Sequence, residues 1–557
     1  MVNEDYTTER NPMNAPQPEA AAQPPAEQIR YPSGLVLPTA QPAPAPRGRT
    51  PLKRGTGKDL ALALVLLGFC FLLWDSLFWA EGLGLGEALG LFALMPAALF
   101  YLAGRPGRMT GYGLILTALS LLGAASLALS GDMSLKVLTM MTLSPLFLIV
   151  LLERLALRTG TGLLARLRDL FTLWFARSFG RIHVGAWTLT HVGEKDSARS
   201  KRTRAILIGL ACAVPALLIL IPLLVSSDAA FAGLVGKLDW DSVGKALFAL
   251  VPGSFAALVL FSLLLTAAPS KEPARNIERK GLEPAAVIAF LAAVSAAYVL
   301  YLVSQFAYFT DAFRGLLPKD FTVAEYARRG FFEMCAIVAI NLLLIVLSVG
   351  LCRKSEGKLP GAVKGLALFL CLFSLVLVVT ALSKMALYMR SFGLTRLRVL
   401  TSAFMLFLAL VVIAEALRLF ARRVPVVQLA VSFGAAILIC LSLLNVDGLV
   451  ARYNVEAWRT GKLDSLDMKT ICELGDGAVP TLAELAVEED EKISAAAAEE
   501  LDDRLVRFGF AEWKWDEEKR TSVAVLKDEP AARLDLRSWN LVSAQAYEAL
   551  KEVIRNK

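Results

Sequence analysis

The chain has 557 residues, of which 56% are hydrophobic and only 19% charged, and its formal net charge is +8. Soluble globular proteins carry about a quarter charged residues, so this composition excludes an ordinary soluble protein and indicates a membrane protein. In such a chain a basic excess is typical of the loops that stay in the cytoplasm. We therefore predict the lipid bilayer as the main partner and no binding of nucleic acid.

The sequence begins with a segment rich in Pro, Ala and Gln, residues 1–58. This composition offers too little apolar surface to fold, and it predicts a disordered cytoplasmic tail. The first apolar run starts only near Leu60, so the segment before it is too long for an ordinary cleaved signal peptide.

Residues 59–444 repeat one pattern, an apolar run of about 20 residues followed by a short polar break, which is the length that a helix needs to cross a bilayer. The pattern predicts an all-α, polytopic transmembrane helix bundle. We expect about eleven spans. They lie near 60–79, 83–103, 111–130, 135–152, 204–225, 244–268, 284–309, 331–352, 361–383, 399–421 and 424–444.

The orientation of the bundle follows from Lys and Arg residues, which are concentrated at alternate ends of the predicted spans. Because basic loops stay inside, the N-terminus is predicted to be cytoplasmic, and an odd number of spans places the C-terminus outside the cytoplasm. The interval 155–203 alternates Arg with Leu, Phe and Trp, which predicts a basic amphipathic loop on the inner, anionic leaflet. A plain amphipathic connector without a ligand is the alternative.

Residues 445–557 differ in composition, since Asp, Glu and helix-forming residues become frequent. They predict a soluble, mainly helical C-terminal domain that could bind a protein partner. We expect two or three short helices over 465–508 and a hairpin over 510–526. No pairing of a nucleophile with a base is found there, so no catalytic residue is assigned.

A metal centre is not predicted either. His183 and His191 are eight residues apart, whereas two ligands on one helix face need a spacing of three or four. The seven cysteines are scattered singly, which predicts neither a disulfide framework nor a metal site. We expect no metal and no other cofactor.

Charged and amide side chains inside the predicted spans are candidates for function, because their burial in lipid is costly. On the predicted topology most of them fall in the outer half of the membrane. This candidate intramembrane cluster comprises Asp75, Glu87, Gln305, Glu333 and Lys384.

Two outward segments, 324–333 and 383–401, carry basic residues where the orientation rule disfavours them. Arg suits bidentate binding of phosphate or carboxylate, so these segments are a candidate site for an anion or a lipid headgroup. A purely structural interpretation stays open, in which Glu325, Arg329 and Glu333 form a charge ladder on one helix face and the tyrosines belong to an interfacial belt. The candidate site comprises Arg328, Arg329, Arg390, Arg396, Arg398, Tyr326 and Tyr388.

Five segments of the chain are distinctive: 222–231, 301–309 with 324–333, 387–398, 451–464 and 535–550. With these segments the chain resembles a family of bacterial multi-pass membrane proteins that is defined only as a domain of unknown function. We identify number 4173 of that series first and the related number 4153 second. The resemblance covers roughly residues 200–550, is weaker over the first four spans, and implies a cell-membrane location but no activity.

Three functions are compatible with these features. The favoured one is a non-enzymatic membrane scaffold or sensor with an extracytoplasmic C-terminal domain. The second is a transporter or lipid-handling protein that binds an anionic headgroup or solute at the outward Arg residues. The third, an enzyme acting on a lipid-linked substrate, would use Asp75, Glu87 or Glu333, although none has a partner that spacing identifies.

Overall fold

The computed structural model describes residues 52–78, 82–104, 108–155, 163–192, 240–266, 281–314, 331–353, 358–516, 521–527 and 538–556, except 53 and 422, together with isolated positions between 202 and 227. Nearly all of the predicted tail 1–58 and most of the predicted span 204–225 therefore lie outside the described residues. The described residues belong to the compact unit Leu52–Lys557.

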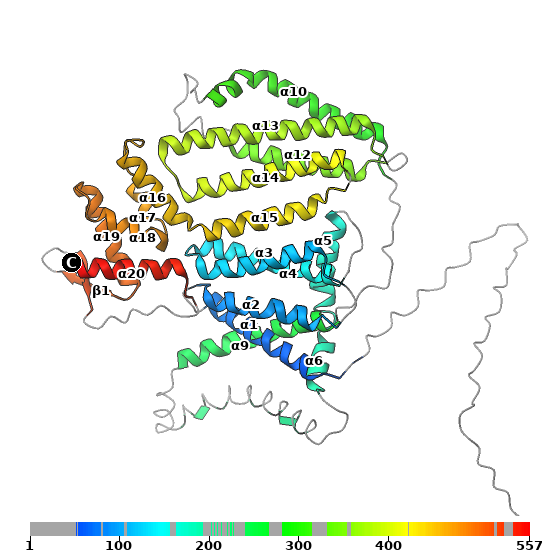
Figure 1. The fold of residues 1–557 in the computed structure, drawn as a ribbon. Coiled ribbons are helices and arrows are strands. Elements are labelled where there is room, and N and C mark those ends of the chain that lie inside the picture. Colours follow the sequence, from blue (N-terminus) through cyan, green and yellow to red (C-terminus); the bar gives the residue numbers. More distant parts are fainter. Residues whose placement is uncertain are drawn as a thin grey trace, which may run out of the picture. The chain divides into compact units, whose positions relative to one another are not determined.

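The described chain is dominated by long apolar helices, which confirms the all-α, multi-pass class (Figure 1). Nine helices in the described residues are long and apolar enough to cross a membrane, and the 17-residue α2 is shorter. Ten of the eleven predicted intervals thus coincide with helices, while the count of about eleven stays a prediction. These helices are α1 (Gly57–Phe78), α2 (Leu85–Tyr101), α3 (Gly111–Leu129), α4 (Met133–Arg154), α9 (Trp240–Thr266), α10 (Pro284–Arg314), α12 (Phe331–Leu351), α13 (Gly361–Phe392), α14 (Arg396–Phe420) and α15 (Val426–Leu443).

The bundle helices bury their apolar side chains in two main cores. One core is formed by α10, α12, α13 and α14, and the other by α1, α2, α4 and α9. Helix α15 packs against α14 on one side and against α3 and α4 on the other, and so connects the two groups. From α1 to α4, and again from α10 to α15, consecutive helices are antiparallel, so alternate connections meet at the same end of the bundle (Figure 1).

Three helices of the first core are joined by a chain of polar side chains. The Tyr298 hydroxyl of α10 donates to Asn341 Oδ1 of α12 over 2.7 Å, and Asn341 Nδ2 donates to the Ser374 hydroxyl of α13 over 3.0 Å. Asn341 and Ser374 are fully buried. A buried amide without partners would be costly in a membrane span. The neighbouring helices satisfy the hydrogen-bonding groups of the Asn341 amide.

Replacing Tyr298 with phenylalanine is expected to lower the free energy of unfolding by about 0.6 kcal/mol, and by no more than about 1.7 kcal/mol, as is typical of hydrogen bonds between membrane helices. Unfolding of the full chain in mixed micelles measures the change. Ser304→Ala is the control, since among the described residues the Ser304 hydroxyl bonds only to the Tyr301 carbonyl of its own helix. Equal losses in the two variants would contradict a role for the contact between helices.

Three short helical segments follow α4: α5 (Leu163–Phe171), the π-helix η1 (Thr172–Arg177) and α6 (Ile182–Thr190). They run across the bundle helices rather than along them (Figure 1). Phe171, Phe175 and Phe179 are exposed and their rings follow one another at centroid distances of 4.7 and 6.3 Å, and Phe179 also meets Phe255 of α9. This aromatic stripe continues the exposed face of a membrane helix.

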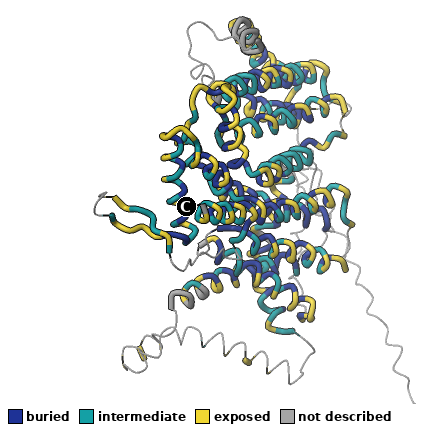
Figure 2. The backbone as a smooth tube through the Cα atoms, turned by 60° about the vertical axis from the view of Figure 1, so that its left-hand side comes forward, coloured by how far each residue is buried: buried dark blue, intermediate teal, exposed yellow. Residues whose placement is uncertain are grey.

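The chain after α15 forms a further set of short helices and one hairpin around a core of their own. Strands β1 and β2 pair antiparallel with Trp513 opposite Ala524, which confirms the hairpin predicted over 510–526. The hairpin is exposed along much of its length, Trp513 and Trp515 included (Figure 2). The elements are α16 (Val446–Arg459), α17 (Met468–Cys472), η2 (Asp476–Ala478), α18 (Val479–Leu485), α19 (Glu491–Arg507), β1 (Ala511–Asp516), β2 (Thr521–Leu526) and α20 (Leu541–Asn556).

Candidate functional site: the joint between the bundle and the C-terminal helices

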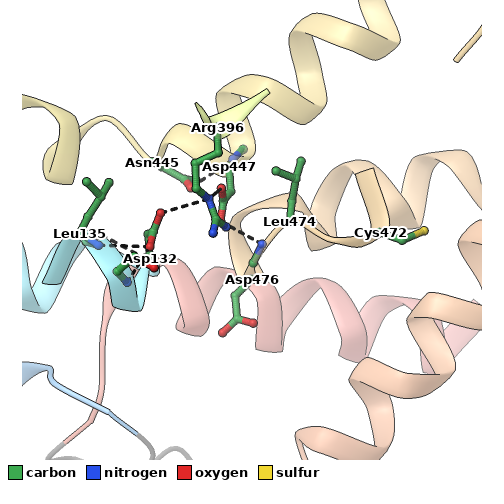
Figure 3. Close-up of polar contacts among 12 residues, drawn as sticks. Asp132, Leu135, Arg396, Asn445, Asp447, Cys472, Leu474 and Asp476 are labelled. Carbon is green, nitrogen blue, oxygen red and sulfur yellow. Dashed lines mark hydrogen bonds and ion pairs between the residues drawn. The ribbon is translucent and has the colours of Figure 1, made fainter. Parts of the chain in front are cut away.

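The candidate site is centred on Arg396, the first residue of α14, at the bundle end that meets the C-terminal helices. Its Nε donates to Asp447 Oδ1 over 2.8 Å and its Nη2 donates to Asp447 Oδ2 over 2.5 Å (Figure 3). Asp447 lies in the first turn of α16 and its side chain is only 3% exposed. The bidentate geometry is the one that makes Arg–carboxylate contacts strong and directional.

A second carboxylate approaches the same guanidinium from the connection between α3 and α4. Asp132 caps α4, since its Oδ1 accepts the backbone N–H groups of Ser134 and Leu135. Its Oδ2 lies 3.2 Å from Arg396 Nε, yet it is buried and accepts no hydrogen bond (Figure 3). One cation therefore lies between two carboxylates that come from different parts of the chain.

Asp447 also holds the chain that leads into η2. Its Oδ2 accepts the N–H of Gly475 over 2.9 Å, so both carboxylate oxygens are engaged. Just before α16, Asn445 adopts a left-handed conformation with φ +45° and caps the helix by accepting the N–H of Gly448. The sharp turn at Asn445 lets α16 begin directly after the last bundle helix.

The turn between α13 and α14 is fixed by an amide of α16. Asn454 Oδ1 accepts the N–H of Leu394 over 2.6 Å, and Asn454 Nδ2 donates to the Leu394 carbonyl over 2.8 Å. The neighbouring Gly393 has φ +72°, and a Cβ there would meet Asn454 Oδ1 at 2.5 Å. Glycine therefore serves both the left-handed turn and the close approach of the amide.

The segment before α20 packs against the start of α2. The Leu85 N–H donates to the Trp539 carbonyl over 2.9 Å. A Cβ on Gly84 would meet the Ser538 carbonyl carbon at 2.4 Å, and one on Gly131 would meet Val542 at 2.6 Å. The C-terminal elements thus contact three bundle connections: α1–α2, α3–α4 and α13–α14.

A buried cation lies next to this packing contact. Lys136 of α4 is 4% exposed, and its ammonium donates to the Leu83 carbonyl over 2.6 Å. The charges of Glu87 and Asp132 act on it. Glu87 itself is fully buried and accepts the Ser76 hydroxyl and the Gly84 N–H. The end of α1 and the starts of α2 and α4 therefore share one polar network.

A cavity of about 760 Å³ lies between the bundle end and the C-terminal helices. On its C-terminal side, Asp476 Oδ2 accepts the Ser543 hydroxyl over 2.7 Å, and Asp476 Oδ1 pairs with Arg507 and with Arg504. The charged side chains that line it are four cationic and four acidic ones: Lys136, Arg396, Arg504, Arg507, Asp132, Asp447, Glu473 and Asp476.

The structure places the predicted anion-site residues as follows. Tyr326, Arg328 and Arg329 lie outside the described residues. Arg390 is exposed near the end of α13.

Sequence spacing revealed no partners for Arg396 or Arg398, and the structure supplies them for both. Arg396 pairs with Asp447 and Asp132, as described above. Arg398 Nη1 donates to the carbonyls of Phe392 and Gly393, and its guanidinium lies 4.1 Å from the Tyr388 ring.

The predicted intramembrane cluster is distributed over two helix groups. Asp75 and Glu87 are buried at the facing ends of α1 and α2, and the charge of Glu87 acts on Lys136. The others lie on helices of the first core: Gln305 on α10, Glu333 exposed on α12, and Lys384 half-buried on α13. The side chain of Gln305 is outside the described residues.

Several polar residues of the joint were missed in the sequence. Asp132 stands as a helix-capping residue between two apolar runs, and Lys136 is a lone cation at the start of a span, so both carry a recognisable local signal. Outside the joint, near the other end of α14, Glu415 is a further buried carboxylate, paired with Arg418 at 2.9 Å. Asp447 has no such signal, because its partner Arg396 is distant in the sequence.

Comparison with protein families decides what the chain is related to. A family model described as a domain of unknown function, DUF4153, matches residues 61–485. The chain belongs to the DUF4153 family. Of the two families that it resembles, the one placed second is therefore shown, and the first, number 4173, is not. No curated protein and no solved structure matches the chain.

The DUF4153 match also changes the extent of the resemblance. It begins in α1, so it includes the first four predicted spans, over which the five segments gave only a weaker resemblance. It ends at the last residue of α18 and leaves out α19, the hairpin and α20. The matched part contains Asp132, Lys136, Arg396, Asp447 and Asn454. The joint on the bundle side is therefore part of the DUF4153 domain.

Proposed function

We propose that this DUF4153 protein is a non-enzymatic membrane sensor or scaffold whose C-terminal helices face outside the cytoplasm. The contact of Arg396 with Asp447 and Asp132 carries the proposal, because it connects α16 to two connections of the bundle through charged groups. Paired charges of this kind have two discrete states, made or broken, and can therefore relay a change from one side of the joint to the other.

The exposed hairpin is the proposed partner-binding part of the C-terminal region. Trp513 and Trp515 are 45% and 65% exposed and lie two residues apart on β1, so both side chains point to the same face. Exposed aromatic side chains are enriched in protein interfaces, where they supply much of the contact area. A protein partner outside the membrane suits this surface.

Site-specific photo-crosslinking in the native membrane tests the scaffold or sensor role. A photoreactive residue at Trp515 is expected to give an adduct with one discrete protein, identified by mass spectrometry. The same residue at Phe420, which is 73% exposed at the end of a membrane helix, is the control and should give lipid adducts only. A Trp515 pattern identical to that of Phe420 would refute the proposal.

The outward Arg residues offer less support for the alternative, a transporter or lipid-handling protein with an anion site. Arg396 is engaged by two carboxylates, and Arg398 by backbone carbonyls and Tyr388. An incoming anion would have to displace these contacts. The inner amphipathic segment is a better place for lipid contact: we propose that the stripe of Phe171, Phe175 and Phe179 lies in the inner leaflet.

Reporter fusions are expected to place the C-terminus and the connection before α10 on opposite sides of the membrane. A fusion after Lys557 should be active only with a reporter that works outside the cytoplasm, and a fusion after Lys280 only with a cytoplasmic reporter, since an odd number of spans and the positive-inside rule require it. A fusion after Lys364, at the start of α13, is the matched cytoplasmic control. Two cytoplasmic signals would remove the extracytoplasmic assignment of α16–α20.

A further inference from the structure

The cavity at the joint is balanced in charge, which restricts what it can bind. Its lining carries four cationic and four acidic side chains. A site with equal numbers of both signs favours neither a simple anion nor a simple cation, because each would be repelled by half of the lining. It suits a ligand that itself carries both charges. The volume of about 760 Å³ lies within the range of small-molecule sites.

Two buried groups in the lining have unused hydrogen-bonding capacity. The Lys136 ammonium has three N–H donors. Among the described residues only one of them is used, in the hydrogen bond to the Leu83 carbonyl. Asp132 Oδ2 is buried and accepts no hydrogen bond, although it lies 3.2 Å from Arg396 Nε. Buried polar atoms are nearly always hydrogen-bonded, so both groups can take up a further hydrogen-bond partner.

The two groups are also placed to act together. Asp132 caps α4 and Lys136 is the fourth residue of that helix, a spacing that puts both on one helix face. One offers an acceptor and the other offers donors within the same turn. A single small molecule with a cationic and an anionic end can therefore satisfy both.

We propose that this cavity binds a zwitterionic group whose anionic oxygens accept hydrogen bonds from Lys136 and whose ammonium donates to Asp132. The group belongs either to a free amino-acid-like solute or to the headgroup of an ethanolamine phospholipid, since the cavity lies at the end of the membrane spans. The inference deepens the proposed sensor function by naming the class of molecule that is sensed.

Binding there has a direct consequence for the joint. Asp132 Oδ2 is the atom that the ligand ammonium would share with Arg396 (Figure 3). A second cation at this oxygen weakens the attraction between Asp132 and Arg396, and leaves Arg396 held by Asp447 alone. The ligand therefore releases the α3–α4 connection from the contact between α14 and α16.

Calorimetry on the purified full chain in micelles tests the free-solute source, with L-serine and O-phosphoethanolamine as soluble probes. Native mass spectrometry of the chain in nanodiscs tests the lipid source by comparing retention of phosphatidylethanolamine and phosphatidylglycerol. We expect saturable binding of a soluble probe, selective retention of phosphatidylethanolamine, or both. Inorganic phosphate and ethanolamine, which each carry one of the two charges, should bind at least tenfold more weakly.

Lys136→Met and Asp132→Asn are expected to weaken binding at least tenfold. Lys462→Met and Asp464→Asn are the matched controls, because these side chains are exposed and outside the cavity. Should the buried variants fail to fold, Ser134→Trp tests the site instead. Ser134 is exposed and lines the cavity. A large side chain there fills the cavity without removing a member of an ion pair. Its gel-filtration profile should match the parent while binding is lost.

The proposal is overturned if no zwitterionic probe or lipid binds, or if Ser134→Trp folds and binds like the parent. These results are distinct from failure of the sensor role, which is judged by crosslinking at Trp515. A chain that binds the zwitterion but contacts no partner would keep the site and lose the sensor function. A chain that contacts a partner but binds no zwitterion would keep the sensor function and lose the zwitterion site.

Discussion

Replacing Arg396 with methionine is expected to lower the free energy of unfolding by about 3–5 kcal/mol, the cost of removing one partner from a buried ion pair. The side chains of Asp447 and Asp132 are 3% and 6% exposed, so the variant leaves two buried carboxylates without their shared cation. Denaturant unfolding in mixed micelles, followed by tryptophan fluorescence, measures the loss.

Two further substitutions separate the geometry of Arg396 from its charge. Arg396→Lys keeps the charge but cannot bind Asp447 through two parallel hydrogen bonds, so an intermediate loss is expected. Arg390→Met removes an exposed guanidinium from the neighbouring helix end and should change stability by less than about 0.5 kcal/mol. If Arg396→Met behaved like Arg390→Met, the ion pairs would contribute nothing to the joint.

A double variant gives the interaction energy itself. Asp447→Leu alone should also be strongly destabilising, because it leaves Arg396 with Asp132 only and frees the Gly475 N–H. Combined with Arg396→Met it removes both members of the pair, and the two losses should be clearly less than additive. Additive losses would show that the two residues act independently, against the bidentate contact.

The membrane helices could be predicted from the sequence because lipid makes the physical requirement local. Each span needs about 20 apolar residues, and backbone groups in lipid must bond within the helix, so hydropathy alone locates most of them. The ends of the spans were harder to predict. The predicted span 361–383 is in fact the first part of α13, which has 32 residues and continues to Phe392. The helix stops only at Gly393, whose positive φ ends it.

The candidate site could be predicted only in part, because its contacts are long-range. Arg396 was identified as a basic residue in need of an explanation, but its partner Asp447 is 51 residues later and Asp132 lies in another helix connection. No spacing rule relates such positions. The same holds for Asn454, which recognises the backbone of Leu394 from 60 residues away. Only folding brings these residues to one end of the bundle.

Replacing Gly84 with alanine is expected to destabilise the joint by about 2–4 kcal/mol, the second large effect. A Cβ at this position would lie 2.4–2.6 Å from the backbone of Ser538 and Trp539, which cannot move without losing the hydrogen bond from the Leu85 N–H to Trp539. Overpacking typically costs about 1–3 kcal/mol, and the lost hydrogen bond adds about 1 kcal/mol.

Gly57→Ala is the matched control for this steric effect, because the new Cβ would meet nothing within 4 Å at the start of α1. Unfolding of both variants is measured as for Arg396, and maleimide labelling of Ser543→Cys reports whether the segment before α20 has moved. Faster labelling in Gly84→Ala than in Gly57→Ala is expected, since displacement of Trp539 also withdraws Asn540, which caps α20 by accepting the Ser543 N–H. Equal stability and equal labelling would mean that the contact between α2 and the segment before α20 does not hold the C-terminal helices in place.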